Sequence, residues 1–134
     1  MRLIACTILL VVLAGCHPLL DDFASQQTPS ACAEEIIRFT PATGCRNDGS
    51  FEFCIPADDP AALAQVFSIA PNTTCVPGRG RAGCDTATQL LCLVGTDGMC
   101  QADQPEAMTN AAWQTTCDLA GLPFISQIVP TWYE

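Results

Sequence analysis

Ten cysteines dominate the chemistry available to this sequence of 134 residues. Two of them, Cys6 and Cys16, lie in or directly after an apolar N-terminal run. The other eight are spread along the rest of the chain: Cys32, Cys45, Cys54, Cys75, Cys84, Cys92, Cys100 and Cys117. An even number in a small exported domain predicts disulfides, here four. Zinc is the alternative, but no Cys-x-x-Cys pair occurs, and structural zinc sites normally contain such pairs. We therefore expect no metal and no cofactor.

The first residues have the form of an export signal. Met1-Arg2 supplies one positive charge, and the apolar run from Leu3 to Leu13 follows. That run is shorter than the roughly 20 apolar residues that cross a bilayer. A charged start, a short apolar core and a small-residue cleavage site are typical of signal peptides.

The signal ends in Leu13-Ala14-Gly15-Cys16. These four residues resemble the lipobox of bacterial lipoproteins. The resemblance implies cleavage before Cys16, whose thiol would carry a diacylglycerol and whose amine would be acylated. Two or more acyl chains make membrane anchoring stable. An ordinary signal peptide cleaved after Ala24 is the alternative.

The lipoprotein resemblance divides the chain into three parts. Residues 1–15 would be the signal peptide, 16–29 the lipidated cysteine and a tether, and 30–134 a single cysteine-rich domain. In the enterobacterial sorting rule, aspartate after the lipidated cysteine retains a lipoprotein in the inner membrane. His17 stands there instead, so the resemblance favours the outer membrane of the bacterial envelope.

The charge balance restricts the partners. Without residues 1–15, four arginines and no lysine stand against fourteen acidic residues, which gives a formal charge of −10. Nucleic-acid binding depends on neutralising phosphates with lysine and arginine, so we expect no nucleic-acid partner. Anionic headgroups should also repel the domain, so membrane contact is expected through the N-terminal lipid. A protein or another envelope component remains as a partner.

Few residues offer catalytic chemistry. The one histidine, His17, lies beside the predicted anchor, which disfavours a serine or cysteine hydrolase because these need a general base. A pair of carboxyl side chains could provide the acid and the base of a glycan hydrolase. Glu52 alternates with Phe51 and Phe53, so it could line a cleft together with Asp58 or Asp59. The alternative is a solvent-exposed acid on a strand and a helix cap at Asp59.

A second feature is an arginine-bearing loop between Cys75 and Cys84. Its sequence, Val-Pro-Gly-Arg-Gly-Arg-Ala-Gly, cannot form a regular element, and Arg79 and Arg81 are half of the arginines outside the signal. In general layout it resembles the reactive loop of small protease inhibitors. The alternative is a solvated turn whose arginines pair with the protein's own acids, which adds little stability.

The elements that would position these residues are short. We predict a helix from Ser30 to about Pro41, a strand over 50–55 and a helix starting at Asp59-Pro60. In that helix Leu63, Val66, Phe67 and Ala70 would form the buried stripe.

Farther along, Thr86-x-x-Gln89 resembles a capping box that opens a helix through Cys92. The longest helix is expected from Pro105-Glu106 to Gly121. The tail 123–133 should be extended and packed back on the domain.

The fold class predicted from these elements is a small disulfide-rich domain, mainly α with a short β element, in which four disulfides cross-link several short helices. The expected function is a lipid-anchored envelope protein that acts as a binding or structural module and is not an enzyme. The alternatives are a small envelope hydrolase with paired carboxylates and a protease-inhibitor-like protein that uses Arg79 and Arg81.

Overall fold

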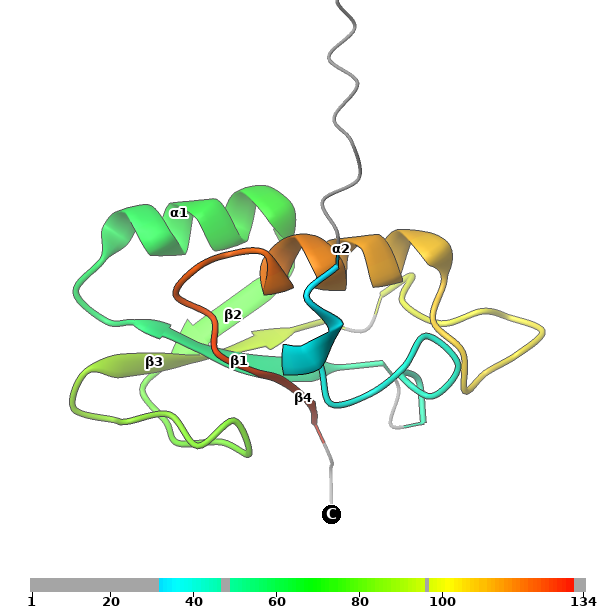
Figure 1. The fold of residues 1–134 in the computed structure, drawn as a ribbon, viewed down its shortest axis with the longest axis horizontal. Coiled ribbons are helices and arrows are strands. Elements are labelled where there is room, and N and C mark those ends of the chain that lie inside the picture. Colours follow the sequence, from blue (N-terminus) through cyan, green and yellow to red (C-terminus); the bar gives the residue numbers. More distant parts are fainter. Residues whose placement is uncertain (1–31, 47–48, 96, 132–134) are drawn as a thin grey trace, which may run out of the picture.

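The computed structural model describes residues 32–46, 49–95 and 97–131, and it shows a four-stranded antiparallel sheet with two α-helices on one face (Figure 1). The strand order is β2-β3-β1-β4. The elements in chain order are the 3₁₀ turn η1 (Glu34–Ile36), β1 (Phe51–Pro56), α1 (Pro60–Ile69), β2 (Thr73–Val76), β3 (Gln89–Val94), α2 (Asn110–Ala120) and β4 (Ile128–Pro130). The prediction of a mainly α fold is therefore wrong.

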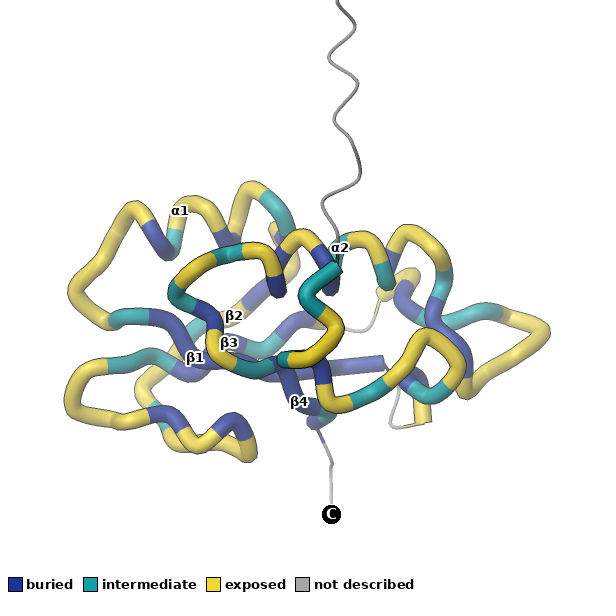
Figure 2. Tube along the Cα trace, in the orientation of Figure 1, coloured by how far each residue is buried: buried dark blue, intermediate teal, exposed yellow. Residues whose placement is uncertain are grey.

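Strand β1 lies in the middle of the sheet, between β3 and β4. The strand predicted over 50–55 is confirmed, and so is its alternation. Phe51, Phe53 and Ile55 belong to the main core beneath the helices, whereas Cys54 belongs to a separate small cluster. The central strands are buried and the outer turns of the helices are exposed (Figure 2). Both faces of the sheet are therefore covered.

Helix α1 begins where the sequence predicted. The Asp59 carboxylate accepts hydrogen bonds from the backbone N–H groups of Ala61 and Ala62, at 2.9 and 3.0 Å, which is ordinary N-cap chemistry. The predicted buried stripe is partly wrong. Val66 is fully buried, but Phe67 is 38% exposed, and Ala62 is buried in its place.

The helix predicted from Thr86 through Cys92 is wrong, because residues 89–94 form β3. Gln89 does reach back, but its side-chain oxygen accepts from the N–H of Asp85 at 2.8 Å. The Asp85 carboxylate accepts in turn from the N–H of Ala87. These bonds close a single turn over residues 85–88. The apolar residues after it then pair with β1 and β2 instead of continuing a helix.

The remaining predictions near the ends of the domain are partly confirmed. In the described part of the helix predicted from Ser30, from residue 32 onward, the 3₁₀ turn η1 is formed and no α-helix, because Ile37 pairs with Ile128 of β4. Helix α2 is the longest helix of the described residues, but it starts at Asn110 with Thr109 as N-cap. The tail packs back on the sheet as predicted, with 128–130 as β4. It is not extended from Pro123, because residues 121–124 form a turn in which the carbonyl oxygen of Leu122 accepts from the N–H of Ile125.

The eight cysteines of the domain form four disulfides: Cys32–Cys117, Cys45–Cys100, Cys54–Cys84 and Cys75–Cys92. Such bonds persist in oxidising compartments, so the domain belongs to an extracellular or exported location. Within residues 32–131, apart from the gaps given above, no helix has the length and apolar character needed to cross a bilayer.

Candidate interaction loop

The segment 77–88, called the arginine loop below, connects β2 to β3 and folds under the sheet, on the face opposite the helices (Figure 1). On this face the side chains of Cys54, Leu91 and Val129 form a small apolar cluster with Ala82 and Cys84 of the loop, and Leu93 packs against it. The loop therefore replaces a second layer of secondary structure on this side of the sheet.

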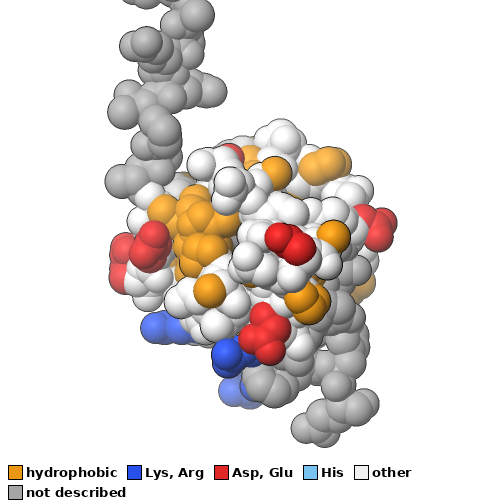
Figure 3. Space-filling model, turned by 90° about the vertical axis from the view of Figure 1, so that its right-hand side faces the viewer, with side chains coloured by type: hydrophobic (Ala, Val, Ile, Leu, Met, Phe, Trp, Pro, Cys, Tyr) orange, Lys and Arg blue, Asp and Glu red, His pale blue; other side chains and the backbone are white. Residues whose placement is uncertain are grey.

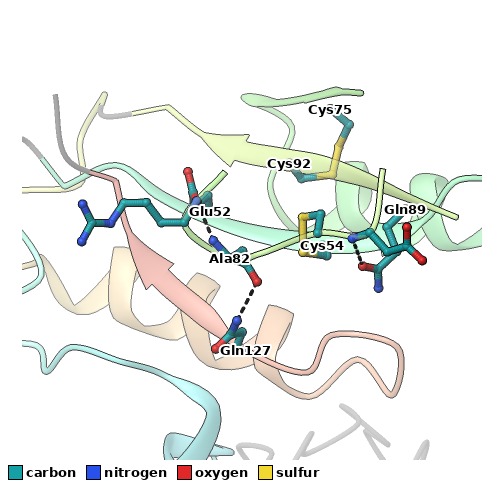
Figure 4. Close-up of a disulfide and its surroundings, with 10 residues drawn as sticks. Glu52, Cys54, Cys75, Ala82, Gln89, Cys92 and Gln127 are labelled. Carbon is teal, nitrogen blue, oxygen red and sulfur yellow. Dashed lines mark hydrogen bonds between the residues drawn. A yellow bond between two sulfur atoms is a disulfide. The ribbon is translucent and has the colours of Figure 1, made fainter. Parts of the chain in front are cut away.

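A disulfide holds the loop to the centre of the sheet. Cys54 in β1 is bonded to Cys84, and their Cα atoms are 5.4 Å apart. Figure 4 shows this disulfide on one side of the strands and the Cys75–Cys92 disulfide on the other. Cys75 and Cys84 lie on either side of the two arginines in the sequence, but they are not bonded to each other. Cys75 is bonded to Cys92 of β3, and Cys84 is bonded to Cys54 of β1.

Glu52 is the second attachment point. Its side chain lies beneath the loop, and the residue is only 3% exposed. The carboxylate oxygen Oε1 accepts hydrogen bonds from the backbone N–H groups of Arg81 and Ala82, the latter at 2.7 Å (Figure 4). The prediction that Glu52 lines an open cleft is wrong, because the arginine loop covers this acid and uses its oxygen.

One further hydrogen bond and one glycine fix the backbone around the arginines. Gln127 Nε2 donates to the carbonyl oxygen of Ala82 at 2.6 Å (Figure 4). Gly80 has φ of 53°, and a Cβ atom there would lie 2.6 Å from both Glu52 Oε1 and Leu91 Cδ1. Only glycine adopts this conformation readily and fits this close to the sheet.

Arg79 and Arg81 are both exposed, as the sequence predicted. The carbonyl oxygen of Arg79 accepts from the N–H of Cys84 at 2.7 Å, so residues 79–84 form one closed turn. The backbone groups of both arginines are therefore held by hydrogen bonds, that of Arg79 to Cys84 and that of Arg81 to Glu52. Binding does not require this backbone to be ordered first, which removes part of the usual entropic cost of association.

The other arginines of the described chain lie elsewhere. Arg46 pairs with Glu106 at 3.3 Å, and both side chains are well exposed. Arg38 follows η1. Arg79 and Arg81 are separated by a single residue, so the arginine loop carries two positive charges close together on a strongly acidic protein. Guanidinium groups match carboxylates and phosphates in bidentate geometry.

The acids do not form a catalytic pair in this region. Asp59 is occupied as a helix cap, and Glu52 is occupied by the loop. A cavity of about 200 Å³ lies between the end of α1 and the start of α2, but Asp97 is the one acid in its lining. In the described ranges, no three His, Cys, Asp or Glu side chains are grouped so that they could hold a metal ion.

Sequence reasoning singled out Glu52 but assigned it another role, and it missed the attachments of the arginine loop to Cys54 and to Gln127. The signal for one of them was present, since Cys54 alternates with the aromatic residues of β1 just as Glu52 does. A cysteine on the outer face of a strand needs a partner that covers that face. The role of Gln127 carries no comparable signal. The predicted lipidation site Cys16 lies outside the described residues.

No protein family, curated protein or solved structure among those compared matches this chain.

Proposed function

We propose that this chain is a lipid-anchored protein of the bacterial envelope, and that its domain is a binding module that holds an acidic partner through Arg79 and Arg81. The observation that carries the second part is the attachment of the arginine loop to the sheet by Cys54–Cys84, Glu52 and Gln127. A glycine-rich segment held in one conformation is what a recognition loop requires, because rigidity lowers the cost of binding.

The anchor is supported by Leu13-Ala14-Gly15-Cys16 and by the disulfides, which require export to an oxidising compartment. His17 favours the outer membrane under the sorting rule given above. Cys32, where the described domain begins, is sixteen positions after Cys16. A fully extended chain of that length spans at most about 55 Å, so the domain would work close to the bilayer.

The arginine loop differs from a protease-inhibitor loop in its backbone. Proteases bind the chain around the scissile bond in an extended form, as an added strand. Here Gly80 is left-handed between the two arginines, and the N–H of Arg81 is bonded to Glu52. An acidic surface that is contacted by side chains alone fits this loop better than a protease cleft does.

The position of Glu52 argues against the glycan-hydrolase alternative. That alternative depended on Glu52 acting together with a second acid across a cleft, whereas Glu52 is covered by the loop. We therefore propose a non-catalytic role for this acid, which is to hold the loop.

The anchor is tested by growing cells with labelled palmitate. The mature protein should incorporate the label, and the Cys16→Ser variant should not. A soluble and unlabelled mature protein that begins near Ser25 would contradict the proposal.

The binding role is tested with an immobilised poly-glutamate peptide at about 0.15 M salt, where charges more than about 8 Å apart are screened, so that the net negative charge of the domain does not outweigh a direct arginine contact. The Arg79→Ala/Arg81→Ala variant should bind at least about tenfold more weakly, since loss of 1.4 kcal/mol at an interface corresponds to a factor of ten. The matched control is Arg38→Ala/Arg46→Ala, which removes the same charge elsewhere on the domain. Equal weakening in both variants would show a general charge effect and contradict a specific loop.

The same loop variant should retain its stability. Exposed side chains contribute little to folding, so its free energy of unfolding should change by less than about 0.5 kcal/mol. A loss above about 2 kcal/mol would mean that the guanidinium groups are buried and structural.

A further inference from the structure

Two aromatic side chains lie beside the point where the described chain begins. The ring of Trp113 in α2 contacts that of Phe39 with centroids 6.2 Å apart, and Phe39 contacts the core residue Phe51 at 5.8 Å. Phe39 and Trp113, called the aromatic edge below, are both partly buried against the main core. They form a continuous path from the core to the surface.

The geometry of α2 places the aromatic edge near the predicted tether. Cys32 is bonded to Cys117 of α2, with Cα atoms 4.7 Å apart. Trp113 precedes Cys117 by four residues, about 6 Å along the helix axis, on the same side of the helix. The Cα atom of Trp113 therefore lies within about 11 Å of that of Cys32.

The surface around this region is apolar in part. The chain after η1 and the start of α2 lie at the right of Figure 1, and Figure 3 views that side. It shows hydrophobic side chains gathered in one patch, with acidic side chains around it. Glu34 and Glu35 of η1, two and three residues after Cys32, are exposed acids on this part of the chain.

We propose that the aromatic edge rests on the lipid surface beside the anchor, with Trp113 at the level of the headgroups. This proposal rests on the lipid anchor proposed above. Tryptophan is enriched at membrane interfaces because its ring is apolar and its N–H remains polar. An anchored domain also meets its own bilayer at a high effective concentration, so a weak contact is sufficient.

The contact would orient the molecule. The aromatic edge joins the core on the helix side of the sheet, whereas the arginine loop joins the cluster on the other side. With the aromatic edge on the bilayer, the arginine loop points away from it, toward partners. The exposed carboxylates of Glu34 and Glu35 further predict a preference for zwitterionic over anionic headgroups.

The test uses the full lipidated protein carrying Trp132→Phe, so that Trp113 is the one tryptophan. The protein is reconstituted in phosphatidylcholine vesicles with or without bromine near the top of the acyl chains. Brominated lipid should quench most of the Trp113 emission, and added phosphatidylglycerol should reduce that quenching. The matched control is Trp113→Phe/Trp132→Phe/Ala87→Trp, whose reporter in the arginine loop should keep its emission.

Vesicle flotation separates the two proposals. Protein that floats with the vesicles but keeps full Trp113 emission in brominated lipid overturns the lipid contact and leaves the anchor standing. A blue-shifted but unquenched Trp113 in floating protein also overturns it, because a second protein copy then covers the aromatic edge. Protein that does not float overturns both the anchor and the contact that depends on it.

Discussion

Replacement of Glu52 by alanine should release the arginine loop from the sheet. The change removes the acceptor of two backbone N–H groups, those of Arg81 and Ala82. A buried donor without an acceptor costs about 1–3 kcal/mol. The Ala82 bond is fully buried and the Arg81 bond is partly buried, so we expect a combined loss of about 2–4 kcal/mol in the free energy of unfolding.

Glu52→Gln is the informative companion variant, because it keeps an oxygen in place and removes the charge. Hydrogen bonds to a charged acceptor are roughly twice as strong as neutral ones. Glutamine should therefore cost about half as much as alanine, about 1–2 kcal/mol. The exposed acid Glu34 serves as a control, and Glu34→Ala should change stability by less than about 0.5 kcal/mol.

Two measurements are needed, since the Cys54–Cys84 disulfide could keep a loosened loop near the sheet. Urea unfolding under non-reducing conditions gives the global loss, and amide hydrogen exchange at Arg81 and Ala82 reports local opening. Both amides should exchange fastest in Glu52→Ala and at an intermediate rate in Glu52→Gln. Unchanged exchange of these amides in Glu52→Ala would refute the role assigned to Glu52.

Two further predictions concern the disulfides and the glycines of the arginine loop. Peptide mapping under non-reducing conditions should recover four linked pairs, Cys32–Cys117, Cys45–Cys100, Cys54–Cys84 and Cys75–Cys92, and a Cys84–Cys92 peptide would contradict the structure. Gly80→Ala should destabilise the domain more than Gly83→Ala, as thermal unfolding would show. Both positions have positive φ, but only at Gly80 would the new Cβ atom meet Glu52 and Leu91; equal losses would show that the close approach is unimportant.

The sequence predicted an element correctly where its hydrophobic pattern or its capping residues match the way the element is buried in the fold. Strand β1 has alternating aromatic and polar residues, and α1 has an aspartate cap followed by proline, so both were predicted close to their observed positions. The capping pattern at Thr86-x-x-Gln89 led to a wrong prediction of a helix, because the same polar groups can also close a single turn that precedes a strand. Pairing with β1 and β2 decided the outcome, and tertiary pairing overrides local propensity.

The sequence predicted the exposed arginine loop, but it did not predict how that loop is attached to the sheet. Glycine and proline around Arg79 and Arg81 are sufficient to predict an exposed loop. The hydrogen bonds between Glu52 and this loop join residues that are 29 and 30 positions apart in the sequence. The Cys54–Cys84 bond is likewise one of 105 ways to pair eight cysteines. Neither follows from periodicity along the chain.

The two faces of the sheet are held in place by different forces. Among the described residues, sixteen belong to the core on the helix face, including three aromatic or large aliphatic side chains of β1. The loop face buries five, of which two are the bonded cysteines. So small a cluster gives little hydrophobic stabilisation, whereas a disulfide that closes a segment of 30 residues contributes about 3–4 kcal/mol by restricting the unfolded chain. The Cys54–Cys84 bond therefore matters most for the part of the molecule that presents the arginines, and its reduction should free the arginine loop before it disturbs the helices.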